Sequence, residues 1–141
     1  MKRHVRIILI VDDSDTDVQL CQLAAARTDI QYDIRHVRDV QSAMQWLTGT
    51  GIYQRRNVFP IPDVIVTDLI MPGAGGLELL RWIRDQPTLR DLPVIVHTHS
   101  DTVGDAVLSE VNGVTKYIVK DNEGRRLVQF LDKLFGNEVG V

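Results

Sequence analysis

Five short apolar runs alternate with five segments of helical periodicity along the 141-residue chain. The runs are VRIILIV (5–11), YDIRHV (32–37), DVIVTD (63–68), PVIVHT (93–98) and KYIVK (116–120). The other segments space their apolar residues three and four positions apart, as amphipathic helices do, and they span 15–27, 39–48, 75–85, 102–111 and 123–135. Strict alternation of strand and helix indicates parallel strands joined by right-handed crossovers. We therefore predict an α/β fold with a doubly wound, five-stranded parallel sheet.

The length of the chain fits one domain with one core, so we expect residues 1–141 to form a single domain. Segment 49–62, GTGIYQRRNVFPIP, carries two glycines and two prolines and breaks both periodicities. We expect a surface loop there, between the second helix and the third strand, and not a linker between domains.

Composition excludes several classes of protein. A formal net charge of −3 gives no support for nucleic-acid binding, which normally requires a basic face. No apolar run approaches the roughly 18 residues of a membrane span, and the basic start MKRHVR leads into acids instead of a secretory cleavage site. The single cysteine, Cys21, suits packing in a reducing compartment. We expect a cytoplasmic protein with no nucleic-acid or membrane partner.

Chemically active side chains stand at the ends of the predicted strands. Asp12 and Asp13 end the first strand, Asp68 the third, Thr98 the fourth and Lys120 the fifth. In doubly wound folds, ligands bind beyond the carboxyl ends of the strands. We therefore expect these five residues to converge on one edge of the sheet.

Converging carboxylates favour a divalent cation. Two carboxylates about 4 Å apart repel by roughly 4 kcal/mol at an effective dielectric constant near 20, and all-oxygen ligands favour Mg²⁺. We predict a Mg²⁺ site formed by Asp13, Asp68 and a backbone carbonyl. Lys120 and Thr98 are suited to contact phosphoryl oxygens, so Asp68 is equipped to attack phosphorus and form an aspartyl phosphate.

Further acids follow the first strand. We assign Asp15 to the N-cap of the first helix, and we expect Asp17 to interact favourably with the dipole of that helix. Asp13, Asp15 and Asp17 also mimic the start of a calcium-binding EF-hand loop, but Val18 and Ala24 stand where that loop requires Gly and Glu. A G-x-G-x-x-G dinucleotide fingerprint is also absent after the first strand.

The motifs ILIVDDSDTD, DVIVTDLIMPGAGGLELLRWIR, PVIVHT and KYIVK resemble those of response-regulator receiver domains. The resemblance spans almost the whole chain. It includes the intervals of 55 residues from Asp13 to Asp68, 30 on to Thr98 and 22 on to Lys120. It implies the flavodoxin-like, CheY-like (βα)5 fold and two-component signal transduction.

The resemblance also implies roles at the site. Asp68 would be the phosphoacceptor, which receives a phosphoryl group from a sensor histidine kinase or a phosphotransfer protein. Asp13 would bind Mg²⁺ directly, Asp12 mainly through water, and the backbone carbonyl of Ile70 would complete the protein ligands. The chain would catalyse only its own phosphorylation and dephosphorylation, and so would not be an enzyme in the metabolic sense.

Signal output would follow from phosphorylation. Thr98 and Lys120 would contact the phosphoryl group, and Tyr117 occupies the position of the family's aromatic switch residue. Static packing of Tyr117 is an open alternative. The surface formed by the fourth helix, fifth strand and fifth helix would bind a downstream protein target or a second copy of the chain. In its long loop before the third strand the chain also resembles stand-alone, single-domain receivers that are paired with bacterial phytochrome kinases.

Two pairs of residues depart from the family pattern. Lys120 is followed by Asp121 where the family carries a proline joined by a cis peptide bond. A cis bond before a non-proline residue costs about 2.5–4 kcal/mol, so we expect a trans bond, or else an enforced strained one. The second departure is His99, which stands where the family usually has a small residue. Our hypothesis is that His99 and Ile70 prolong the lifetime of the aspartyl phosphate. The alternative is that His99 points to solvent.

Two other functions stay open. A receiver fold that no longer needs phosphate would act as a binding scaffold. A Mg²⁺-dependent phosphohydrolase would need a general acid two residues after the nucleophile, but Leu69 and Ile70 follow Asp68. We expect no output domain after the last helix, so that the chain acts through a partner.

Overall fold

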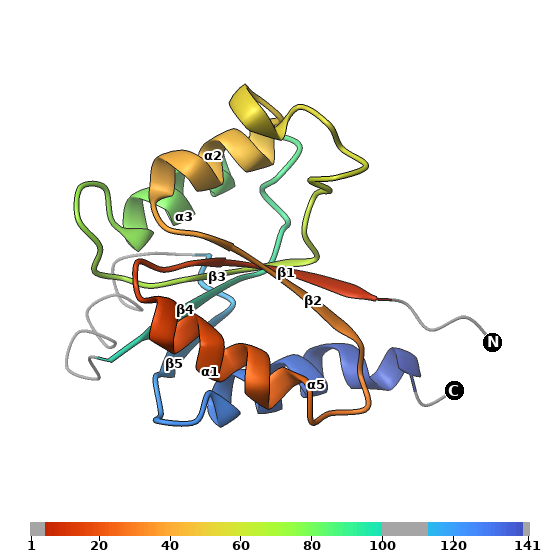
Figure 1. Ribbon diagram of the computed structural model, residues 1–141. Coiled ribbons are helices and arrows are strands. Elements are labelled where there is room, and N and C mark those ends of the chain that lie inside the picture. Colours follow the sequence, from red (N-terminus) through yellow and green to blue (C-terminus); the bar gives the residue numbers. More distant parts are fainter. Residues whose placement is uncertain (1–4, 100–112, 140–141) are drawn as a thin grey trace.

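The computed structural model describes residues 5–99 and 113–139 (Figure 1). Its centre is a parallel sheet whose strands are arranged in the order β2-β1-β3-β4-β5. The strands are β1 (Arg6–Val11), β2 (Tyr32–Val37), β3 (Val64–Thr67), β4 (Val94–Thr98) and β5 (Lys116–Val119). The order reverses between β1 and β3, which is the topological switch point of the doubly wound fold. The predicted sheet is therefore confirmed.

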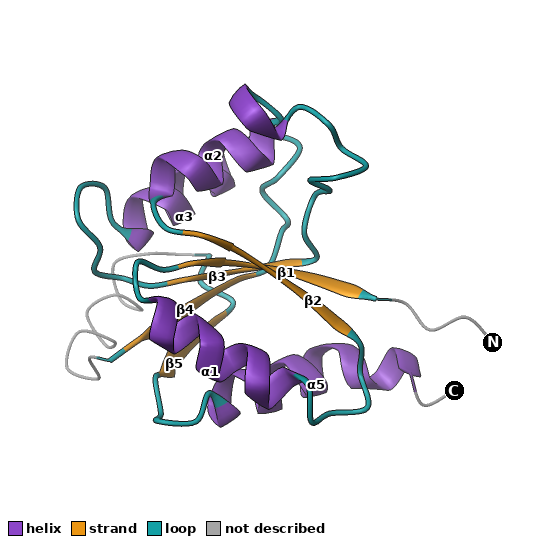
Figure 2. Ribbon diagram, in the orientation of Figure 1, coloured by secondary structure: helices purple, strands orange, loops and turns teal. Residues whose placement is uncertain are grey.

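Helices cover both faces of this sheet (Figure 2). They are α1 (Asp15–Ala25), α2 (Val40–Thr48), α3 (Gly76–Asp85) and α5 (Arg125–Val139), with the short 3₁₀ helix η1 (Gly51–Tyr53) after α2. Helices α2 and α3 lie on one face, and α1 and α5 lie on the other. The helix predicted at 102–111 lies outside the described residues. None of the described helices combines the length and the apolar character that a membrane crossing requires.

The strands are apolar on both sides because both sides are covered. Leu9 and Val11 of β1 pack in the core beneath α2 and α3, whereas Ile8 and Ile10 pack against α1 and α5. All four side chains are buried. This explains why the sequence of β1 shows a continuous apolar run, since alternation is expected only where one face is exposed to water.

The N-cap residue of helix α1 lies one residue before the predicted one. Ser14, and not Asp15, is the N-cap residue, and its hydroxyl accepts a hydrogen bond from the backbone N–H of Asp17 at 3.3 Å. The assignment of Asp15 to the N-cap was wrong: Asp15 is the first residue of the helix and pairs with Arg38. The turn is fixed by Ser14 N–H, which donates to Oδ1 of Asp12 at 2.9 Å.

Segment 49–62 is a packed loop. Gly49 ends α2 in the left-handed conformation, with φ at 68°. The guanidinium of Arg56 donates to the carbonyl oxygens of Trp46, Leu47 and Phe59 at 2.6, 2.8 and 3.0 Å. The rings of Trp46 and Phe59 pack edge to face, with centroids 5.1 Å apart. The loop is therefore anchored to the end of α2.

Candidate functional site

The acids after β1 and β3 meet at the carboxyl edge of the sheet. Strand pairing continues past the strands, because Asp12 N–H donates to the Val37 carbonyl at 3.1 Å and Asp68 N–H donates to the Val11 carbonyl at 2.9 Å. One carboxylate oxygen from each of Asp12, Asp13 and Asp68 lies within 4.8 Å of the other two. The two acids predicted on β1 and the acid predicted on β3 therefore form one cluster.

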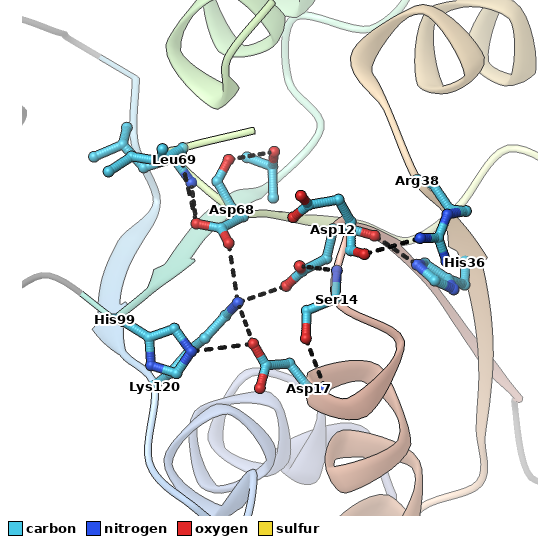
Figure 3. Close-up of polar contacts among 12 residues, drawn as sticks. Asp12, Ser14, Asp17, His36, Arg38, Asp68, Leu69, His99 and Lys120 are labelled. Atoms are coloured by element: carbon cyan, nitrogen blue, oxygen red, sulfur yellow. Dashed lines mark hydrogen bonds and ion pairs between the residues drawn. The ribbon is translucent and has the colours of Figure 1, made fainter. Parts of the chain in front are cut away.

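Lys120 approaches the same cluster from the end of β5 (Figure 3). Its Nζ lies 2.7 Å from Oδ2 of Asp12 and 3.0 Å from Oδ2 of Asp68. Its backbone N–H donates to the carbonyl of Thr98 at 2.7 Å. The Lys120 side chain is only 2% exposed, so water has little access to it. The positive charge is therefore compensated by the carboxylates instead of by solvent.

A third carboxylate, Asp17 of α1, reaches this ammonium. Lys120 Nζ lies 2.8 Å from Oδ2 of Asp17. The prediction limited Asp17 to a dipole role at the start of the helix and so missed its contact with the site. The signal was present in the spacing: Asp17 lies four residues before buried Cys21, on the face of α1 that packs against the sheet.

The ionisation of the site follows from one ammonium among several acids. Burial lowers the pKa of Lys120, but hydrogen bonds to Asp12, Asp17 and Asp68 outweigh it and raise the pKa above its ordinary value. Burial raises the pKa of Asp12 more than the bond from Lys120 lowers it. One buried cation is thus shared among more carboxylates than it can neutralise.

The carboxylate of Asp68 is oriented by its own loop. Its Oδ1 accepts hydrogen bonds from the backbone N–H groups of Leu69 at 2.7 Å and Ile70 at 3.3 Å. Its Oδ2 faces Lys120. The backbone of this loop is held by Gly76, whose N–H donates to the Leu69 carbonyl at 3.2 Å. Asp68 is therefore fixed at both oxygens.

The donor set suits a hard divalent cation. Mg²⁺ binds oxygen ligands at about 2.1 Å in an octahedron, which places opposite ligands about 4.2 Å apart. The carboxylate oxygens of Asp12, Asp13 and Asp68 span a space of this size. Asp13 is exposed, whereas Asp12 and Asp68 are buried. The three acids therefore fit one metal ion that keeps part of its water shell.

Two residues of β2 and its following turn hold the backbone of the candidate metal-binding acids. His36 Nε2–H donates to the carbonyl of Asp12 at 2.7 Å. Arg38 donates to the carbonyl of Asp13 at 3.1 Å and also pairs with Asp15. These contacts fix the backbone of the β1–α1 turn without using the carboxylates of Asp12 and Asp13.

The other predicted residues surround the cluster at different depths. Thr98 is buried at the end of β4, and Tyr117 is half-buried beside Leu69 and Val96. Ile70 is 67% exposed. This packing of Tyr117 is compatible both with a switch and with a static role, so its role stays a prediction, as do the ligand role of Ile70 and the phosphoryl contact of Thr98.

His99 lies at the rim of the site. Its side chain is largely exposed, yet its Nε2 lies 3.1 Å from Oδ2 of Asp17. Figure 3 shows the ring beside Lys120 and Asp17. His99 therefore does not simply point to solvent, which was one of the two interpretations, and its effect on phosphoryl lifetime stays a prediction.

Asp121 has a clear structural role. The described backbone contains no cis peptide bond, so the Lys120–Asp121 bond is trans, as expected. The Asp121 carboxylate accepts hydrogen bonds from the backbone N–H groups of Glu123, Arg125 and Arg126 at 3.0, 3.1 and 2.9 Å. Burial raises the pKa of Asp121, but these bonds outweigh it and hold the pKa below its usual value. Asp121 thus orders the start of α5 where proline would constrain the chain.

A buried histidine lies just before Thr98. His97 is 4% exposed, and its Nε2 finds no hydrogen-bond partner among the described residues. Burial, with a smaller contribution from the charge of Lys120, lowers the pKa of His97 to about 4. The imidazole is therefore neutral at physiological pH. The burial of this histidine was not predicted from the sequence, because His97 occupies an ordinary core position of β4.

Comparison with known proteins gives a consistent result. The sequence model of the response regulator receiver domain matches residues 8–132. Response regulator Rcp1 of Synechocystis sp. is 31% identical over 126 residues, which cover 89% of this chain and 84% of Rcp1. The crystal structure of the phosphorylated cyanobacterial phytochrome response regulator RcpA matches with a TM-score of 0.79 at 30% identity, over 97% of this chain and 96% of that one. The Mn²⁺-bound form of Rcp1 matches with a TM-score of 0.78 at 30% identity, over 92% and 94%.

Proposed function

The chain belongs to the response regulator receiver domain family of two-component signalling, and from that premise we propose that it is a Mg²⁺-dependent phosphorylation switch with Asp68 as the phosphoacceptor. In this proposal Asp68 takes a phosphoryl group from a histidine of a sensor kinase or from a phosphotransfer protein. The chain catalyses only its own phosphorylation and dephosphorylation.

One observation carries this proposal. One carboxylate oxygen of Asp68 lies within 4.8 Å of a carboxylate oxygen of Asp12 and of Asp13, and Oδ2 of Asp68 lies 3.0 Å from the Lys120 ammonium. A nucleophile between a cation site and a fixed ammonium suits attack on a phosphoryl group, because the charge on the transferred oxygens is stabilised from two sides.

The reaction transfers a phosphoryl group from a nitrogen or oxygen atom of the donor to a carboxylate oxygen of Asp68. A carboxylate oxygen of Asp68 forms a bond to phosphorus, while the bond from phosphorus to the donor breaks and its electron pair leaves with the donor. Acetyl phosphate would release acetate. A phosphohistidine would release neutral imidazole after its nitrogen takes up a proton from solvent.

The residues of the chain contribute orientation and charge. Backbone N–H groups of Leu69 and Ile70 hold one oxygen of Asp68 in place, and Lys120 would contact a phosphoryl oxygen. When bound, Mg²⁺ neutralises negative charge that develops on the phosphoryl oxygens. Asp12 and Asp13 would hold that ion together with Asp68 and the carbonyl of Ile70.

Partners follow from the same proposal. Rcp1 and RcpA are named as response regulators, the latter of a phytochrome, which supports a kinase of the phytochrome type as phosphoryl donor. We propose that phosphorylation, which adds about −1.5 to −2 charge, alters the surface around β5 and α5. That surface would bind a downstream protein or a second copy of the chain.

Intact mass measured after incubation with acetyl phosphate and Mg²⁺ tests the proposal. The expected result is a gain of one phosphoryl group in the wild type and none in Asp68→Asn. Sustained turnover of unrelated phosphoesters would favour the phosphohydrolase instead. Absence of modification by acetyl phosphate and by a kinase would favour a binding scaffold.

A further inference from the structure

The ammonium of Lys120 has no free donor in this structure. An ammonium group has three N–H donors, and carboxylates of Asp12, Asp17 and Asp68 lie at 2.7, 2.8 and 3.0 Å. Asp12 and Asp68 also belong to the metal-binding cluster, but Asp17 does not. Asp17 is therefore an additional acid whose contact with the site is made through Lys120.

The same oxygen of Asp17 contacts a second side chain. Oδ2 accepts from Lys120 and also lies 3.1 Å from Nε2 of His99. Figure 3 shows Asp17, at the start of α1, with Lys120 and His99 on one side of its carboxylate. One carboxylate oxygen of α1 thus contacts the residue that follows β5 and the residue that follows β4.

The Asp17 carboxylate is suited to remain charged in this position. Its side chain is 18% exposed, so it is partly shielded from water. Burial raises its pKa, but the hydrogen bonds and positive charges of Lys120 and His99 together outweigh burial and hold the pKa of Asp17 below the usual value. The negative charge therefore persists at neutral pH beside Lys120.

We propose that Asp17 is a positioning residue that restrains Lys120 in the resting state and gives up this contact when a phosphoryl group arrives at Asp68. This inference rests on the proposed function. A phosphoryl oxygen needs one N–H of Lys120, and all three are occupied by carboxylates. Asp17 is the partner that can leave without disturbing the metal-binding cluster.

The exchange has a cost and a consequence. The resting contact must be broken, and the charge of Asp17 repels the incoming phosphoryl group, so both effects slow phosphorylation. Loss of the Lys120 contact also changes the environment of His99, because both side chains share Oδ2 of Asp17. Asp17 therefore links the occupancy of the phosphorylation site to the backbone directly after Thr98.

The test compares Asp17→Asn with Asp15→Asn. Both substitutions remove one negative charge from the first turn of α1, but Asp15 pairs with Arg38 instead of Lys120. The readout is the rate of phosphorylation by acetyl phosphate at saturating Mg²⁺, followed by intact mass. We expect Asp17→Asn to react about fivefold faster than the wild type, as suits a partly exposed ion pair, and Asp15→Asn to react at the wild-type rate. Asp17→Glu, which keeps the charge, restores the slower rate.

His99 provides a second readout. His99 anchors the other side of the Asp17 carboxylate, so His99→Ala also accelerates phosphorylation, but by less than Asp17→Asn. In the double variant, His99→Ala adds nothing to the effect of Asp17→Asn. If its acceleration persisted there, His99 would act by its bulk alone and the linkage would be refuted.

The outcomes separate this inference from the proposed function. A wild type that shows no Asp68-dependent phosphorylation would overturn both. A wild type that is phosphorylated normally, while Asp17→Asn reacts at the same rate as Asp15→Asn or more slowly, would overturn the role of Asp17 alone. Urea unfolding of each variant identifies any loss of folded protein, and Asp17→Glu separates loss of charge from loss of structure.

Discussion

The Nζ atom of Lys120 lies 3.0 Å from Oδ2 of Asp68, although 52 residues separate the two in the chain. Adjacent parallel strands produce this contact, because the ends of β3, β4 and β5 lie at one edge of the sheet. The contact joins the proposed phosphoacceptor to a cation, and it ties the stability of the fold to the charge balance of the site.

Removal of that cation should destabilise the protein. Lys120→Met leaves buried Asp12 and Asp68 without their partner, which we expect to lower the free energy of unfolding by about 3 kcal/mol in the absence of divalent ions. Urea denaturation measures this, and added Mg²⁺ should recover more stability in the variant than in the wild type.

The control is Lys116→Met: Lys116 is exposed and lies over the Phe130 ring, so its loss should cost less than about 1 kcal/mol. Equal costs would contradict the account.

Removal of the exposed acid of the proposed metal site should have the opposite effect: little change in stability but a loss of Mg²⁺ affinity. Asp13 is exposed, so Asp13→Asn should leave the free energy of unfolding nearly unchanged. We expect it to raise the dissociation constant for Mg²⁺ by about tenfold or more, since loss of even a supporting contact costs about this much. Calorimetric titration with Mg²⁺ measures the constant, with Asp15→Asn as the matched control. Unchanged affinity in Asp13→Asn would remove Asp13 from the metal site.

Two glycines near Asp68 should respond differently to a methyl group. A Cβ on Gly76 would overlap the backbone carbonyl of Asp68, so Gly76→Ala should cost about 3 kcal/mol and slow phosphorylation by displacing the acceptor. Gly73 has φ at 80° with open space around it, so Gly73→Ala should cost only about 1–2 kcal/mol. Urea denaturation and phosphorylation rates measure both. A harmless Gly76→Ala would show that this loop does not position Asp68.

Buried His97 should make stability depend on pH. Its pKa falls from 6.5 in the unfolded chain to about 4 in the fold, chiefly because of burial. Between these values the unfolded chain binds more protons, so stability is complete above about pH 6.5 and declines toward pH 4, by about 3 kcal/mol.

The variant His97→Leu should lack this decline in stability at low pH. It should also be more stable than the wild type at pH 7 by about 1 kcal/mol, because the substitution removes a buried Nε2 that has no hydrogen-bond partner in the described part of the chain. Urea denaturation at several pH values compares the two proteins, and contributions from other titrating groups cancel in the difference. Parallel pH profiles would show that His97 is not buried as described.

The strands, the topology and the main cluster of the site were predictable from the sequence. Their signals are local or follow from parallel pairing: apolar runs locate strands, and the acids and Lys120 directly follow them. Asp17 was not predicted to reach the site, because its position depends on the rotation of α1. That rotation follows from the packing of Val18 and Cys21 against the sheet, and Asp17, four residues before Cys21, lies on the same face of the helix.

The two departures from the family pattern illustrate the same limit. A trans bond at Lys120–Asp121 was predictable from the cost of a cis bond, but the capping of α5 by Asp121 depends on the path of the following turn. The contact of His99 with Asp17 joins residues 82 positions apart. The contact of Asp121 depends on a local turn, and that of His99 depends on the packing of α1 beside the end of β4.

Peptide mapping by mass spectrometry tests whether Asp68 accepts a phosphoryl group with the aid of Mg²⁺. The protein is incubated with acetyl phosphate and Mg²⁺, and the acyl phosphate is then reduced with borohydride, which converts a modified aspartate to homoserine. The account predicts homoserine at position 68 alone, and none when Mg²⁺ is chelated. Modification at another residue, or at position 68 without any divalent ion, would contradict it.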